Sequence, residues 1–216
     1  MPKLSSHHAS LRLHAILDVD VADRAGWQVL PLAEAFLAGG ARVIQLRAKH
    51  LASGVFLQHA DRLVRAAAAH DAQIVVNDRA DLALLAGAAG AHVGQEDLPP
   101  AAVRRLLGPE AVIGFSTHTV PQIEAAVREP VTYIAIGPVF GTVTKDTGYE
   151  AVGLERVREA VRIAAGLPVV AIGGITLQNA ASVIEAGASS VAVIGDLLSE
   201  GDPAARVAAF RRVLSL

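Results

Sequence analysis

The chain has 216 residues, of which 52% are hydrophobic and 4% aromatic, and its 19 basic and 21 acidic side chains give a net charge of −2. This near balance of charge argues against nucleic acid or an anionic membrane surface as a partner. The sequence has no cysteine, which excludes disulfides, thiolate metal sites and cysteine nucleophiles.

The N-terminal segment, residues 1–10, is polar, and we expect it to be disordered. It lacks the apolar stretch of a secretory signal. Nowhere do about 18 apolar residues follow one another without a charge, as a membrane span would require. These features predict a soluble, cytoplasmic protein with a single folded domain over residues 11–216.

Eight short runs rich in Val and Ile alternate with helix-length segments rich in Ala and Leu. Because most of the runs are continuously apolar, we expect parallel strands that are covered on both faces. The predicted strands are residues 11–17, 41–46, 73–76, 90–93, 111–115, 132–136, 168–172 and 190–194. The predicted helices are residues 30–37, 54–70, 81–88, 100–107, 121–127, 154–165, 177–186 and 203–214. This order predicts an α/β protein with a single (β/α)8 TIM barrel, and a doubly wound open sheet is the alternative.

Basic side chains follow the second predicted strand, which ends in Gln45, Arg47 and Lys49. In a parallel barrel, functional residues gather at the carboxyl ends of the strands. A lysine and the fork of an arginine suit the oxygens of a phosphate. The alternative is that both are ordinary solvated loop charges.

Two acids, Asp78 and Asp97, follow the third and fourth predicted strands, which are neighbours in a barrel. Two carboxylates without cysteine favour Mg²⁺ over zinc. Asp97 has an alternative role as the N-cap of the next helix. Together with the basic side chains, the two acids predict a diphosphate site with a magnesium ion.

Glycines end the last two strands at Gly173, Gly174 and Gly195. Barrels often bind a second phosphate here through backbone N–H groups, although glycines also simply permit tight turns. Residues 141–153 form the longest irregular internal segment, which we interpret as a lid over bound ligands or as a solvated surface loop.

Three histidines lie in or next to predicted strands. His118 follows a strand end, where it would act as a general base or hydrogen-bond the backbone of its own loop. His92 lies inside an apolar run, which favours a packed histidine with satisfied hydrogen bonds. His14 is placed similarly, with the alternative of pointing into the barrel mouth.

Taken in order, the strand ends resemble those of the thiamine phosphate synthase family. The resemblance runs from about the first strand to the eighth, and the ordered series is its specific part. The motifs that carry it are Gln45-Leu46-Arg47-Ala48-Lys49, Asn77-Asp78-Arg79, Gly94-Gln95-Glu96-Asp97, Ser116-Thr117-His118, Thr142-Val143-Thr144-Lys145 and Gly173-Gly174.

The resemblance implies a (β/α)8 transferase that joins a hydroxymethylpyrimidine diphosphate to a thiazole phosphate, giving thiamine phosphate and pyrophosphate. Its partners would be these two phosphorylated small molecules. Whether the chain forms a homo-oligomer is left open. By position, the residues that would bind the pyrimidine diphosphate are Gln45, Arg47, Lys49, Asn77, Ser116 and Lys145, and those with catalytic roles are Arg47, Lys49, Ser116 and Lys145. Asp78 and Asp97 would hold Mg²⁺. The residues around the thiazole phosphate would be Thr142, Val143, Thr144, Gly174, Ile194 and Gly195.

The sequence departs from the family pattern at Ala48, Gly195 and Asp146, where the family commonly has Glu, Ser and Lys. One alternative function is that of the related thiazole tautomerases, with His118 as the base, and another is non-catalytic binding of phosphorylated ligands. The presence of Asn77 and of the two acids favours the synthase, because a tautomerase needs no diphosphate site.

Overall fold

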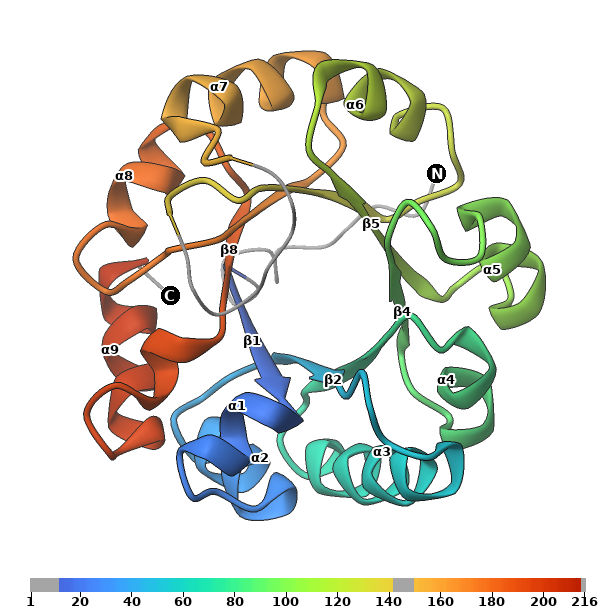
Figure 1. The fold of residues 1–216 in the computed structure, drawn as a ribbon, viewed down its shortest axis with the longest axis vertical. Helices are drawn as coiled ribbons and strands as arrows, with labels where there is room; N and C mark the ends of the chain where they lie inside the picture. The colour runs from blue at the N-terminus through green and yellow to red at the C-terminus, as the bar shows by residue number, and fades with distance from the viewer. Residues whose placement is uncertain (1–11, 142–149, 215–216) are drawn as a thin grey trace.

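The computed structural model describes residues 12–141 and 150–214. Its strands form a closed barrel in chain order, and every pairing between them is parallel (Figure 1). The strands are β1 Leu13–Asp18, β2 Val43–Arg47, β3 Gln73–Asn77, β4 Gly90–Val93, β5 Val112–Thr117, β6 Tyr133–Ile136, β7 Val169–Ile172 and β8 Ser190–Val193. Because β1 pairs with both β2 and β8, the predicted (β/α)8 barrel is confirmed, and the open-sheet alternative is wrong.

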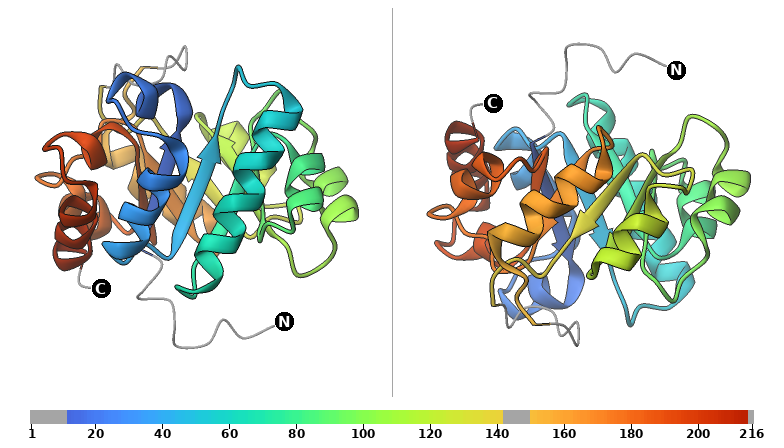
Figure 2. Two further views of the ribbon diagram at one scale, coloured as in Figure 1. Left: turned by 90° about the horizontal axis from the view of Figure 1, so that it is seen from below. Right: turned by 90° about the horizontal axis from the view of Figure 1, so that it is seen from above.

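The helices form a ring outside the barrel and run alongside the strands (Figures 1 and 2). They are α1 Val19–Arg24, α2 Val29–Ala38, α3 Ser53–Ala68, α4 Ala80–Ala86, α5 Pro100–Leu107, α6 Val120–Ala126, α7 Gly153–Ala164, α8 Ala180–Glu185 and α9 Pro203–Val213, with the 3₁₀ helix η2 at Gly195–Leu198. The short elements α1 and η2 are absent from the sequence prediction. No helix in the described ranges is long and apolar enough to cross a membrane.

Helix α8 starts later than its apolar spacing predicts. Residues 177–179 form a turn instead of the first helical turn. The Thr176 N–H donates to Asn179 Oδ1 at 2.8 Å, and the Leu177 N–H donates to Asp196 Oδ2 at 3.0 Å. These side-chain acceptors hold the segment after β7 as a loop, which places it beside the end of β8.

The core has two parts. A large cluster of Ala, Val, Leu and Ile side chains with a few Phe fills the space between the strands and the surrounding helices. A much smaller cluster comprises Ile16, Tyr133, Ala135, Val170 and Ala192. All five of these residues also line a cavity, and the small side chains of the two alanines leave space for it.

Candidate active site

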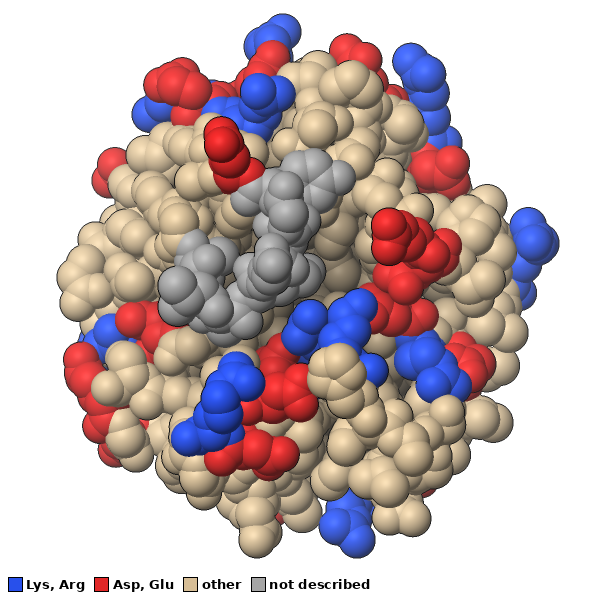
Figure 3. Space-filling model, viewed as in Figure 1, with Lys and Arg blue, Asp and Glu red and all other residues tan. Residues whose placement is uncertain are grey.

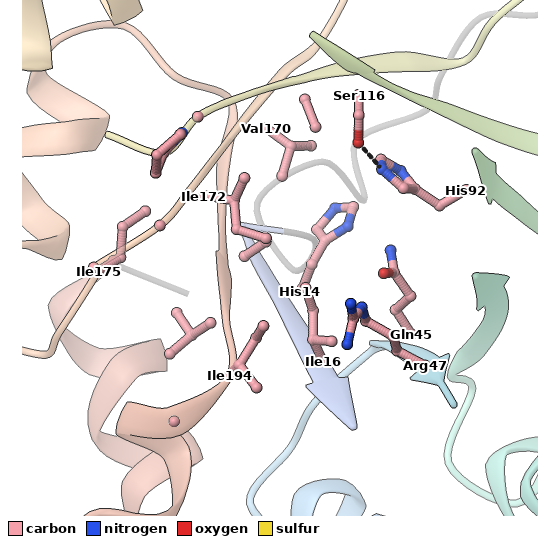
Figure 4. Close-up of a pocket in the computed structure, with 18 of the residues that line it drawn as sticks. His14, Ile16, Gln45, Arg47, His92, Ser116, Val170, Ile172, Ile175 and Ile194 are labelled. Atoms are coloured by element: carbon pink, nitrogen blue, oxygen red, sulfur yellow. Dashed lines mark hydrogen bonds between the residues drawn. The ribbon is translucent and has the colours of Figure 1, made fainter. Parts of the chain in front are cut away.

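A cavity of about 410 Å³ lies at the carboxyl ends of the strands, a volume that suits a small organic ligand. Figure 4 shows Gln45, Arg47 and His92 on one side of it and Ile175 and Ile194 on the other. The predicted site residues that line the cavity are Gln45, Arg47, Asn77, Ser116, Gly174, Ile194 and Gly195. The cavity therefore has a polar side from β2 to β5 and an apolar, glycine-containing side after β7 and β8.

Arg47, at the end of β2, is held by a carboxylate that the strand-end motifs do not include. Asp18 is only 4% exposed, and its Oδ2 pairs with Arg47 Nη1. Its Oδ1 accepts the Val21 N–H at 3.1 Å and so caps α1. Asp18 directly follows the first predicted strand, so the strand-end rule that found Arg47 also points to it.

Lys49, Asp78 and Asp97 form a charged cluster beside the cavity without lining it. Lys49 Nζ lies 2.5 Å from Asp78 Oδ2. The pKa of the Asp97 carboxyl is raised above its ordinary value, first by burial and then by the hydrogen bond and charge of Asp78. The hydrogen bond from the Gly94 N–H and the charge of Lys49 act in the opposite direction. The structure thus brings the two predicted acids together next to a cation. Basic and acidic side chains also mingle near the middle of the face seen in Figure 3.

The alternative N-cap role of Asp97 is wrong. Asp97 Oδ2 accepts the Gly94 N–H at 2.7 Å, and the N-cap position of α5 is occupied by Pro99, which makes no side-chain capping bond. The carboxylate therefore closes the turn after β4 and stays next to Asp78. Asp78 itself adopts a left-handed backbone conformation with φ of 63°, which Asp and Asn tolerate better than most residues.

This pair of acids fits a magnesium ion. Among the described residues, no group of three or more His, Cys, Asp or Glu side chains could enclose a metal on its own. Mg²⁺ commonly takes only one or two protein carboxylates and completes its shell with water and substrate phosphates. Two adjacent carboxylates at the edge of a cavity match that pattern.

A chain of hydrogen bonds forms the polar floor of the cavity. Ser116 Oγ lies 2.8 Å from His92 Nε2, and His92 Nδ1 lies 3.0 Å from Tyr133 Oη. Burial raises the pKa of Tyr133 above its ordinary value, and a hydrogen bond with Gln45 lowers it. His92 is therefore the packed and hydrogen-bonded residue that the sequence predicts, and it also lines the cavity. Tyr133 was missed because a tyrosine inside an apolar run is typical of an ordinary strand.

His14 points into the cavity (Figure 4), which is the second of the two placements that the sequence predicts for it. Its ring meets Tyr133 edge to face, with 5.2 Å between the ring centroids. Burial lowers the pKa of His14 to about 4. The imidazole is therefore neutral at physiological pH.

The other side of the cavity offers backbone donors. Within the described parts of the chain, the N–H groups of Gly174 and Gly195 donate no hydrogen bond, and both residues line the cavity. Gly174 has a φ of 62°, and the Gly141 carbonyl oxygen and the Phe140 Cβ leave no room there for a Cβ. Backbone N–H groups in such loops are typical anion binders.

His118 also lines the cavity. Its Nδ1 lies 2.6 Å from the Gly137 carbonyl oxygen, and its N–H donates to Gln122 Oε1 at 2.8 Å. Thr119 and Gln122 form a capping box at the start of α6. The ring of His118 thus bonds a backbone carbonyl of the loop after β6 rather than the backbone of its own loop, and the residue lines the cavity.

Four predicted site residues lie outside the described residues, namely Thr142, Val143, Thr144 and Lys145. Most of the predicted lid segment, residues 141–153, lies there too. The same holds for the predicted disordered segment, residues 1–10.

Comparison with known proteins places the chain in a family. The family model for thiamine monophosphate synthase matches residues 16–197. A thiamine-phosphate synthase from Koribacter versatilis (strain Ellin345) is 44% identical over 205 residues, which are 94% of this chain and 95% of that protein. Another from Anaeromyxobacter dehalogenans (strain 2CP-C) is 45% identical over 176 residues, which are 82% of this chain and 78% of that protein.

A solved structure of similar fold is the thiamine phosphate pyrophosphorylase from Pyrococcus furiosus. It matches with a TM-score of 0.86 at 29% sequence identity, covering 96% of this chain and 97% of that one. The sequence relatives and this structure agree with the resemblance that the strand-end motifs carry. The chain belongs to the thiamine monophosphate synthase family.

Proposed function

We propose that this chain forms thiamine phosphate and pyrophosphate from 4-amino-2-methyl-5-(diphosphooxymethyl)pyrimidine and 4-methyl-5-(2-phosphooxyethyl)thiazole. Its family is one of transferases that condense a pyrimidine with a thiazole. The observation that carries the proposal is one cavity that has Arg47 and the adjoining charged cluster at one side and the glycine N–H groups after β7 and β8 at the other. Two phosphorylated substrates need both sides at once.

The diphosphate belongs at the polar side. Arg47 and Lys49 supply positive charge at the end of β2, and Lys145 adds to it in our proposal although it lies outside the described residues. The amides of Gln45 and Asn77 and the hydroxyl of Ser116 hydrogen-bond the pyrimidine and its diphosphate. The ion pair with Asp18 fixes Arg47 at the cavity wall, so little side-chain entropy is lost on binding.

Asp78 and Asp97 would hold Mg²⁺ at this side. When bound, the ion neutralises charge on the diphosphate oxygens as a Lewis acid. Lys49 stands within ion-pair distance of Asp78, so it limits repulsion between the two carboxylates and the incoming diphosphate. The cations of Arg47 and Lys49 would stabilise the same leaving group.

The thiazole phosphate belongs at the glycine side. The N–H groups of Gly174 and Gly195 bind its oxygens, and Ile194 packs against the thiazole ring. In our proposal Thr142, Val143 and Thr144 complete this subsite. Gly195 lacks the hydroxyl that the family's usual serine offers, so the backbone carries the contact here.

The reaction then follows from the two positions. The bond between the pyrimidine methylene carbon and the diphosphate oxygen breaks, and its electron pair leaves with pyrophosphate. The 4-amino group donates electron density through the ring and stabilises the methylene cation. The lone pair of the thiazole nitrogen forms the new C–N bond, which yields the thiazolium without any proton transfer. Positioning by the two phosphate subsites supplies much of the rate, so no protein nucleophile is needed.

A thiazole tautomerase that uses His118 is the second candidate. His118 faces the same cavity and is oriented through Gly137. A tautomerase, however, leaves the cluster of Lys49, Asp78 and Asp97 without a role. The synthase gives this cluster a role, which is why we favour it.

The test is to incubate the protein with both substrates in Mg²⁺ and then in excess chelator, and to quantify thiamine phosphate and pyrophosphate together. Equal, magnesium-dependent formation of both products supports the proposal. Lys49→Met should abolish most turnover, whereas Arg158→Met, which removes an exposed cation of α7, serves as the matched control and should behave like the unchanged protein. Absence of thiamine phosphate in both conditions would overturn the proposal, and conversion of a thiazole tautomer would then favour the tautomerase.

A further inference from the structure

Arg206 on α9 is a cation that neither the strand-end motifs nor the proposed reaction uses. Its side chain is only 6% exposed. Nε donates to the Asp196 carbonyl oxygen at 3.1 Å, and Nη2 donates to Asp196 Oδ1 and Oδ2 at 3.1 and 2.9 Å. Nη1 donates to Glu200 Oε1 at 2.7 Å. An arginine this buried, with every nitrogen engaged, is a fixed part of the structure rather than a solvated surface charge.

The partner of Arg206 belongs to the glycine side of the cavity. Asp196 directly follows Gly195, lines the cavity and has a side chain 13% exposed. Its Oδ2 also accepts the Leu177 N–H, as described for the loop after β7. One carboxylate therefore joins the loop after β8 to the loop after β7, and Arg206 donates hydrogen bonds to that carboxylate.

A second set of hydrogen bonds, made by Asn179, holds the loop after β7. Asn179 Nδ2 donates to the Gly174 carbonyl oxygen at 3.0 Å, while Asn179 Oδ1 accepts the Thr176 N–H. Gly174 is thus tied at its carbonyl and Gly195 through its neighbour Asp196. The two N–H groups that donate no hydrogen bond within the described residues sit on loops that these side chains hold at a fixed separation.

Electrostatics gives Arg206 a second task. A carboxylate at the wall of a phosphate subsite repels the phosphate, and the repulsion is strong where water is scarce. The bidentate contact with Arg206 cancels most of the charge of Asp196. Without the arginine, a buried and unpaired carboxylate would face the ligand.

We propose that Arg206 is a positioning residue for the thiazole phosphate: it neutralises Asp196 and holds the two loops so that their N–H groups bind the phosphate. The proposal rests on the proposed function, because that function places the phosphate at this end of the cavity. Arg206 touches no substrate and acts through Asp196.

The test compares Arg206→Met with the double variant Arg206→Met, Asp196→Asn. Methionine keeps much of the aliphatic volume but leaves Asp196 unpaired. We expect the KM for the thiazole phosphate to rise about tenfold or more, because like charges now meet. The KM for the pyrimidine diphosphate should stay within about twofold. The double variant, which has no unpaired charge but still lacks the loop contacts of Arg206, should recover part of the lost affinity.

Arg212→Met is the matched control, because Arg212 is an exposed arginine of the same helix; it should leave both KM values unchanged. If Arg206→Met does not fold, Arg206→Lys takes its place, with a smaller rise of the same KM expected. An equal change in both KM values, no change in either, or no recovery in the double variant would overturn the proposal.

Binding of inorganic phosphate by calorimetry separates this inference from the proposed function. If the unchanged protein makes no thiamine phosphate but binds phosphate, and Arg206→Met loses that binding, the proposed function fails and the inference holds. If the unchanged protein is active and Arg206→Met binds phosphate equally well, the inference fails and the function holds.

Discussion

Replacing Gly114 with alanine is expected to damage both the stability and the activity of the protein. Gly114 lies in β5, directly paired with His92 of β4 and Tyr133 of β6. The two rings stack over it, with centroids 5.6 Å apart and planes 24° from parallel. A Cβ at Gly114 would lie less than 3.0 Å from the Tyr133 ring and from His92 Nδ1. The floor of the cavity therefore exists because this position has no side chain.

The cost can be worked out from these contacts. Inserting a methyl group into a filled core costs about 1–3 kcal/mol, and losing the hydrogen bond between His92 and Tyr133 costs about 1 kcal/mol more. A total of about 3 kcal/mol corresponds to a fall in Tm of about 10 °C for a chain of this size. Because His92 also bonds Ser116, we expect turnover to fall by about tenfold.

The assay is thermal unfolding followed by circular dichroism, together with the two-product activity measurement. Gly54→Ala is the control: Gly54 lies near the start of α3, where an added Cβ would meet no heavy atom within 4 Å, and alanine there should raise stability by up to about 1 kcal/mol. A Gly114→Ala variant that melts within about 2 °C of the unchanged protein and keeps full turnover would refute this account of the cavity floor.

Three other variants test separate parts of the site. His14 has a pKa of about 4 in the folded state, against 6.5 for an ordinary histidine, so the unfolded chain binds more protons between these pH values. The free energy of unfolding should therefore fall by about 3 kcal/mol as the pH drops through this window. Urea titrations should show a shallower fall for His14→Gln. Asp78→Asn keeps the left-handed backbone but removes a carboxylate from the charged cluster, so turnover should drop about 10²–10³-fold with Tm nearly unchanged; turnover near that of the unchanged protein would contradict the metal assignment. Asp18→Asn retains the cap of α1 but breaks the ion pair with Arg47, at a cost of about 3 kcal/mol, whereas Asp202→Asn, an exposed cap of α9, should cost under about 0.5 kcal/mol.

The barrel was predictable because most residues of the strands are buried, on both faces of the sheet. Continuous runs such as residues 73–76 and 190–193 carry that burial directly in their composition. Helix boundaries were less predictable, because they depend on contacts between distant residues. The start of α8 is an example: the acceptor for Leu177 comes from Asp196, on another strand's loop, and no local pattern contains that information.

The site was predictable in so far as polar residues interrupt apolar runs. This rule selects Arg47, Asp78 and Asp97, and it also applies to Asp18, which directly follows the first predicted strand. It missed Tyr133, because a tyrosine fits an apolar strand, and Arg206, because an arginine fits a helix surface. In both cases burial among distant elements makes the residue important, and burial is a property of the fold.

The pairing of β1 with β8 has a consequence for how the molecule is made. A chain leaving the ribosome presents β1 long before its partner β8 has been synthesised. Until then, β1 and the most recently completed strand each expose a row of unpaired N–H and C=O groups, which readily pair with other chains. Synthesis that pauses between β4 and β8 should therefore favour aggregation, because β1 then lacks the strand that covers its free edge.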